Sequence, residues 1–248
     1  MCQSINNFIA EETNYEINDA ITQSIFLYRG IAKIHTITRF SDEWKDPFDS
    51  VTREETFTVS GGRTIKMQMM HTSSQVQVKK IHEEYGTFTR IPYEGGCSMI
   101  IYMRHEAAAF PQIYDDISWM SKDSRFEKIK SDLENVEEGS YILAMPKFKY
   151  EMITNITNGI YNIDPFCQFS MSDMFNETVM TPFQYLDNIS HETSSRIDNN
   201  EQGTSPESVL TCSKFRGYIH KIDKPFCFFI LQTSGHIIDL GIFTGTYC

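Results

Sequence analysis

The sequence has no long apolar run, and one of its most apolar segments, residues 226–231, is far too short to span a bilayer. Its opening residues, 1–7, contain neither a basic start nor an apolar stretch, so they do not resemble a secretory signal peptide. Basic residues are outnumbered, with 22 Lys and Arg against 33 Asp and Glu and a formal net charge of −11. We therefore expect a cytoplasmic protein whose main partner is neither a membrane nor nucleic acid or heparin.

Cysteine is sparse, and motifs for catalysis are missing. The six cysteines are scattered without a CxxC pair, which favours free thiols in a reducing compartment over disulfides or a metal site. The sequence contains no GxSxG elbow, P-loop, GxGxxG or HExxH motif, and its histidines lack metal-ligand spacing. Adjacent acidic residues, such as Glu83 and Glu84, are expected to be solvated surface. We expect a protein that is not an enzyme and that needs no cofactor or metal.

The residues that are present predict mainly strands. Between Thr64 and Met70 the apolar Ile65, Met67 and Met69 alternate with polar neighbours, as in a half-buried strand. Other expected strands cover residues 56–59, 75–79, 99–103, 141–152, 226–231 and 236–243; expected helices cover 5–13, 110–117 and 125–133; and turns are expected at 61–62 and 233–235. The pattern predicts an α+β fold dominated by antiparallel sheet, in one domain over residues 1–248.

Three separated stretches are similar to signatures of a single family, in that family's order. The first combines INNFIAEETN at residues 5–14 with WKDPF at 44–48; the second is IPYEGGCSMII at 91–101; the third includes DKPFCFFI at 223–230. The matching motif positions singled out are Trp44, Pro47, Phe48, Tyr93, Pro225 and Phe226. Together these stretches resemble the serpins, a family of serine protease inhibitors.

The resemblance implies an incomplete serpin fold, with sheets B and C, part of sheet A and few helices. By this resemblance the chain would begin near helix F and lack helices A to E, including the buried helix B that covers sheet B. An uncovered sheet B would expose a large apolar patch and call for another protein to cover it, an oligomer or poor solubility. Shortened chains of this kind occur among viral serpins, so a viral origin would fit. Serpins are commonly extracellular, which contrasts with the lack of a signal peptide.

The sequence NEQGT at residues 200–204 resembles the hinge of a serpin reactive-centre loop, which would cover about residues 201–217. The hinge residues by this resemblance are Glu201, Gly203, Thr204 and Pro206. In serpins the cleaved loop inserts into sheet A as a new strand, dragging the acylated protease with it. Gly203 and Thr204 suit such a strand, but Pro206 lacks the N–H that a ladder needs.

The bait position is ambiguous. Counting forward from Glu201 by the usual serpin loop length reaches Gly217, beside Arg216, whereas counting back from Pro225 reaches Lys214. Either basic residue would suit a trypsin-like serine protease, and both could equally be ordinary loop charges.

Two functions follow from the resemblance. The first is a serpin-type inhibitor whose activity could be weak or lost. The alternative is a non-inhibitory protein–protein interaction module. The alternative is favoured by Pro206, by the missing helices and by the polar run from His191 to Arg196, which is unusually polar for a central strand.

Overall fold

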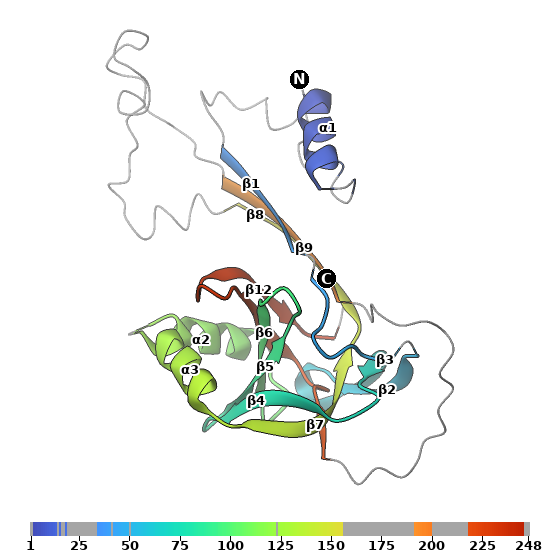
Figure 1. The fold of residues 1–248 in the computed structure, drawn as a ribbon, viewed down its shortest axis with the longest axis vertical. Helices are drawn as coiled ribbons and strands as arrows, with labels where there is room; N and C mark the ends of the chain where they lie inside the picture. The colour runs from blue at the N-terminus through green and yellow to red at the C-terminus, as the bar shows by residue number, and fades with distance from the viewer. Residues whose placement is uncertain are drawn as a thin grey trace. The chain divides into compact units, whose positions relative to one another are not determined.

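The computed structural model describes residues 2–13, 15, 18, 34–40, 42–49, 51–122, 124–155, 191–199 and 218–245. The chain forms two compact units, one from residues 1–40 and 150–197 and the other from residues 41–149 and 198–248. The expectation of a single domain over residues 1–248 stays a prediction. Figure 1 shows the elements of both units in chain order by colour.

The described residues of the first unit form a helix, α1, and most of a small sheet. Helix α1 spans Cys2–Glu12, as expected, and buries Ile9 and Ala10. It ends where the Thr13 side chain turns back and its Oγ1 donates to the Ile9 carbonyl at 2.7 Å. The sheet has the strand order β1-β9-β8, formed by Ile34–Phe40, His191–Asn199 and Phe148–Asn155.

Strand β9 is central in this sheet despite its polar sequence. It pairs in parallel with β1, from Ile34 opposite His191 to Phe40 opposite Ile197, and lies between β1 and β8. The polar composition of residues 191–196 made a central strand unexpected. Ladder hydrogen bonds come from the backbone, and Thr is itself favoured in strands, so polarity alone does not prevent the pairing.

The second unit is built on a sheet with the order β12-β11-β6-β5-β4-β7-β3-β2, to which β10 is added beside β7. Figure 1 shows this sheet curling as it passes from β12 to β2. Its strands are β2 Arg53–Thr58, β3 Thr64–His71, β4 Val76–His82, β5 Gly86–Pro92, β6 Ser98–Arg104, β7 Glu138–Pro146, β10 Ile219–Lys221, β11 Phe226–Leu231 and β12 Ile237–Phe243. Neighbouring strands are antiparallel except for β10 and β7, which are parallel.

The predicted turns are confirmed. A short 3-10 turn at Ser60–Gly62 joins β2 to β3, and Gly61 and Gly62 have φ values of 80° and 77°. These left-handed values are readily reached only without a Cβ.

The expected strand over 141–152 forms two strands, β7 and β8, separated at Lys147 immediately after Pro146. The Lys147 N–H still donates to the Gln68 carbonyl at 3.0 Å, which keeps this junction on the sheet.

Two helices cover one face of the sheet. Helices α2, Phe110–Met120, and α3, Arg125–Asn135, extend the predicted helices by a few residues; α2 packs on β11 and α3 on β4. Alternate residues of β11 contribute to the core cluster that also holds residues of both helices, because successive side chains of a strand point to opposite faces. The buried members of this cluster include Phe88, Ile100, Ile113, Ile129, Leu133, Cys227, Phe229 and Leu231.

The other alternate residues of β11 join an aromatic cluster. Phe226 lies 5.8 Å from Phe148 and 5.2 Å from Phe243 between ring centroids, and Phe228 lies 5.5 Å from Phe148. All six residues of β11 are therefore buried. Along this strand the expected exposure of an uncovered sheet B is not observed.

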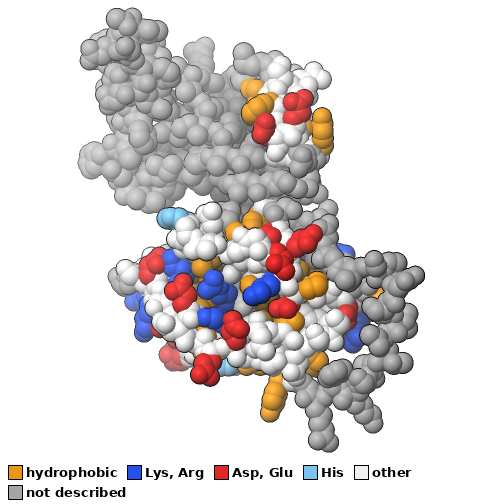
Figure 2. Space-filling model, viewed as in Figure 1, with side chains coloured by type: hydrophobic (Ala, Val, Ile, Leu, Met, Phe, Trp, Pro, Cys, Tyr) orange, Lys and Arg blue, Asp and Glu red, His pale blue; other side chains and the backbone are white. Residues whose placement is uncertain are grey.

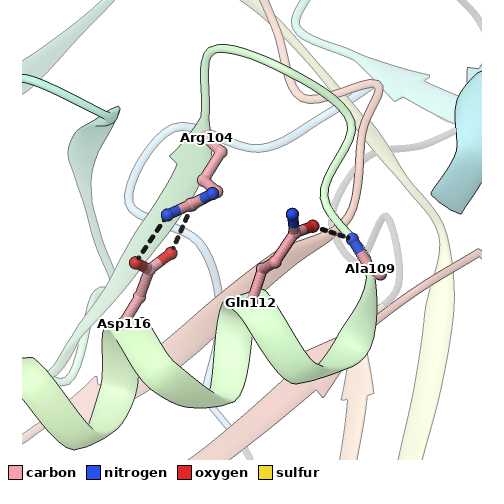
Figure 3. Close-up of polar contacts among 4 residues, drawn as sticks. All are labelled: Arg104, Ala109, Gln112 and Asp116. Atoms are coloured by element: carbon pink, nitrogen blue, oxygen red, sulfur yellow. Dashed lines mark hydrogen bonds and ion pairs between the residues drawn. The ribbon is translucent and has the colours of Figure 1, made fainter.

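A paired charge fixes α2 against the sheet (Figure 3). Arg104 at the end of β6 donates from Nε to Asp116 Oδ2 at 2.7 Å and from its terminal nitrogen to Oδ1 at 3.1 Å. At the start of the helix the Gln112 side chain accepts from the Ala109 N–H at 2.8 Å. This bond satisfies a backbone donor near the helix start, where Ala109 has no side-chain acceptor of its own.

The surface of the second unit mixes both charge signs, and Figure 2 shows acidic and basic side chains interspersed on one face of it. Within the described residues, no helix combines the length and apolar character needed to cross a membrane.

Candidate functional site

The predicted hinge and bait residues lie outside the described part of the structure. They are Glu201, Gly203, Thr204, Pro206, Lys214, Arg216 and Gly217. The structure does describe the chain on both sides of them: β9 ends at Asn199, and the chain resumes at Tyr218 and enters β10.

The predicted motif residues near the start of the second unit form one aromatic cluster. Trp44 makes an isolated antiparallel bridge with Tyr93, and their rings stack with centroids 4.2 Å apart. Phe48 packs edge-on against Trp44 at 5.7 Å and is 2% exposed, whereas Pro47 stays exposed in the turn between them. Burial is the main reason that the pKa of Tyr93 is raised well above its usual range, with smaller effects from Asp42 and Cys97.

Backbone bonds hold this cluster in place. The Lys45 N–H donates to the Pro92 carbonyl at 3.1 Å, and the Glu94 N–H donates to the Glu43 carbonyl at 2.8 Å. The Asp42 side chain also accepts from the Gly95 N–H at 3.1 Å. The segment that follows β1 along the chain is thus attached to the β5–β6 turn, although the two are about fifty residues apart in sequence.

The other predicted motif residues, Pro225 and Phe226, lie at the start of β11, just downstream of β10. Both are buried, and Phe226 belongs to the aromatic cluster with Phe148 and Phe243. Trp44, Tyr93 and Phe226 all belong to the second unit.

Strand β10 anchors the downstream end of the 201–217 segment. Its residues Ile219 to Lys221 pair with Ile142 to Ala144 of β7. The first bond of this ladder is donated by the Ile142 N–H to the Tyr218 carbonyl at 3.1 Å, and the last by the Ile222 N–H to the Ala144 carbonyl at 2.8 Å. The chain is consequently fixed from Tyr218 onward.

His220, the middle residue of β10, has its side chain in a buried polar site. Its Nε2 lies 2.8 Å from Thr89 Oγ1 and its Nδ1 lies 3.2 Å from Lys80 Nζ. Burial, followed by the charges of Lys80 and His82, lowers the pKa of His220 to about 4. The pKa of Lys80 is lowered as well, because of burial. At neutral pH His220 is therefore an uncharged hydrogen-bonding partner.

Lys221 joins β10 to strands β2 and β3 through one carboxylate. Glu55 Oε2 lies 2.7 Å from Lys221 Nζ, and Glu55 Oε1 lies 2.7 Å from His71 Nε2. Burial alone would raise the pKa of Glu55, but Lys221 and His71 lower it on balance. Sequence reasoning missed this network, because Glu55, His71 and Lys221 become neighbours only through the strand pairing.

The family model for "Serpin (serine protease inhibitor)" matches residues 1–247. Serine proteinase inhibitor 1 of vaccinia virus (strain Copenhagen) is 30% identical over 98% of this chain and 68% of its own length. The monkeypox virus protein of the same name is 30% identical over 98% of this chain and 67% of its own length.

A solved structure gives the same fold. Serpin48 of the insect Tenebrio molitor superimposes with a TM-score of 0.70 at 18% identity, covering 99% of this chain and 65% of that one. The chain thus spans about two thirds of the length of the proteins it matches. The strand order, the family model and the viral relatives agree, and the fold is an incomplete α+β serpin fold. The chain belongs to the serpin family.

Proposed function

We propose that this protein is a serpin-type inhibitor of serine proteases and that residues 201–217 are its reactive-centre loop. The observation that carries the proposal is the pair of anchors: the segment leaves the central strand β9 and returns at the hydrogen-bonded β10. The relatives named serine proteinase inhibitor support the same activity. Inhibition by loop capture needs no catalytic group in the chain itself, so the protein acts as a protease ligand and not as an enzyme.

The position of β9 sets the cost of loop insertion. A loop that folds back beside β9 would run antiparallel to it, but both edges of β9 are already paired, with β1 and with β8. Insertion therefore requires the seven paired positions between β1 and β9 to separate. The inserted strand would then form hydrogen bonds with β1 on one edge and with β9 on the other. The free energy of these bonds favours insertion and so drives trapping.

The anchor at Tyr218 favours Lys214 over Arg216 as the bait residue. A protease cleft holds its substrate extended on both sides of the cleaved bond. After Arg216 only Gly217 precedes the fixed Tyr218 carbonyl, whereas Phe215, Arg216 and Gly217 all follow Lys214. Cleavage between Lys214 and Phe215 leaves room for the protease, and a basic bait residue suits a trypsin-like specificity pocket.

A second candidate function is a non-inhibitory interaction protein, which Pro206 favours. Proline would remove one ladder donor from the inserting segment. In that case the loop would be cleaved as a plain substrate and the protease would be released.

Incubation with trypsin tests the proposal. We expect a protease–serpin complex that survives boiling in detergent, lost in Lys214→Ala and kept in the matched control Arg216→Ala. Loop cleavage without any such complex would reject trapping and support the second candidate. A complex lost only in Arg216→Ala would move the bait position to Arg216.

A further inference from the structure

Lys80 is a half-buried lysine whose amine has no acidic partner among the described residues. Its Nζ lies 3.2 Å from Nδ1 of His220 and 5.2 Å from the centre of the Tyr141 ring. None of the ion pairs found in the described part of the chain includes Lys80. Taking an ammonium group out of water without a carboxylate to pair with it is unfavourable, so this position disfavours the charged form of Lys80.

Four strands bring the groups around this amine together. Lys80 of β4 pairs with Thr89 of β5, while Tyr141 belongs to β7 and His220 to β10. Thr89 and His220 are both buried. The surroundings of the Lys80 amine are therefore set by the sheet itself and not by exposed surface side chains.

The environment of Lys80 changes its chemistry. The uncharged amine of a lysine is a nucleophile, whereas the ammonium form has no lone pair with which to attack. Burial lowers the pKa of Lys80, so a larger share of its amine is uncharged than in an exposed lysine at the same pH. Because the His220 ring and the Tyr141 ring lie close to Nζ, a small electrophile suits this position better than a bulky one.

Carbon dioxide is such an electrophile, and the neighbours of Lys80 can hold the product. Nζ forms a bond to the carbon, one C–O π pair moves onto oxygen, and Nζ releases a proton to water, which leaves a negatively charged carbamate. His220 can donate to this group from Nδ1, because Thr89 Oγ1 lies 2.8 Å from its Nε2 and a hydroxyl can donate as well as accept. His82 is also near enough for the charge of Lys80 to affect its pKa, and its protonated form would attract the carbamate.

We propose that Lys80 is a modification site that takes carbon dioxide reversibly as a carbamate. The group at this position then changes from positive to negative, and its repulsion of a protonated His82 becomes attraction. The site lies on described strands, away from residues 201–217, and it does not depend on the proposed inhibitor function.

The test uses the full chain with isotopically labelled bicarbonate as the source of carbon dioxide. We expect a carbamate carbon signal by NMR that is lost in Lys80→Arg, because a guanidinium group stays protonated. The adjacent Lys79 provides the matched control. Its Nζ donates to the Glu134 carbonyl outside this site, so Lys79→Arg should keep the signal. Alkylation of the carbamate followed by peptide mass spectrometry should place the added carbon on Lys80 in the unmodified protein.

A second readout needs no variant. The pKa of His82 is lowered by burial, then by Lys80 and by His105, so carbon dioxide should raise it when the charge of Lys80 is reversed. NMR titration of His82 with and without bicarbonate measures this change. The proposal is rejected if the unmodified protein gives no carbamate signal, if the signal survives Lys80→Arg, or if trapping finds other lysines modified to the same extent as Lys80.

Discussion

At the scale of single residues, His220 has the environment most sensitive to acid. It is 7% exposed and lies between Thr89 and Lys80, with His82 and Tyr141 also near it. The charge beside its Nδ1 is the positive one of Lys80. Protonating His220 would therefore place two positive charges side by side in a buried site.

We predict that His220 makes the protein less stable in acid. Its pKa is about 4 in the folded protein and about 6.5 when unfolded, so between these values the unfolded state binds more protons. The contribution of His220 to the free energy of unfolding is complete above pH 6.5 and is lost as the pH falls toward 4. It amounts to about 3 kcal/mol. Urea unfolding measured from pH 7 to pH 4 should show a steep fall, and His220→Gln should make it shallower.

The exposed His236 provides the control for this experiment. His236→Gln should keep the pH dependence of the unmodified protein. Equal slopes for His220→Gln and the unmodified protein would mean that His220 is not the group responsible.

At the scale of elements, β10 depends on side chains as much as on its ladder. The strand has three residues and pairs with β7 along one edge. Such a short edge strand is weak by itself, so the contact of Lys221 with Glu55 should contribute substantially to keeping it in place. Glu55 in turn is oriented by His71, whose Nδ1 is buried without a hydrogen-bond partner.

We predict that Glu55→Gln loosens the downstream anchor of the loop. The neutral amide removes two charge-assisted contacts, at a cost of about 1 kcal/mol. Hydrogen exchange at the Ile222 N–H, which donates to the Ala144 carbonyl, should accelerate about five- to tenfold. The neighbouring exposed Glu54 provides the control variant Glu54→Gln, which should leave that exchange rate unchanged. Identical exchange in both variants would show that the ladder alone holds β10.

The elements also show how far the sequence could predict this fold. The alternation in residues 64–70 predicted β3, and the apolar run at 226–231 predicted β11, because burial patterns are local. Periodicity did not identify β5, although part of it lies in the family signature at 91–101; its sequence from Gly86 to Pro92 mixes Thr and Arg with apolar residues. The network of Glu55, His71 and Lys221 was beyond prediction, since it depends on which strands become neighbours.

At the scale of the whole molecule, the proposed activity depends on one structural change. The loop must enter the sheet beside β9, and the β1–β9 ladder must open to admit it. The polar residues of β9 do not prevent its pairing, so the remaining obstacle visible in the sequence is Pro206. Its missing N–H would leave one ladder position without a donor in the inserted state.

Cleavage of the loop should therefore stabilise the protein less than it would without the proline. We predict that Pro206→Ala increases the rise in melting temperature that follows cleavage after Lys214. The restored donor contributes about 1–3 kcal/mol to the inserted state, which corresponds to roughly 2–12 °C for a chain of this size. Calorimetry on intact and cleaved protein measures the rise, with Ser205→Ala as the matched loop variant. If cleavage leaves the melting temperature unchanged in all three proteins, the loop does not insert, and the chain binds proteases without trapping them.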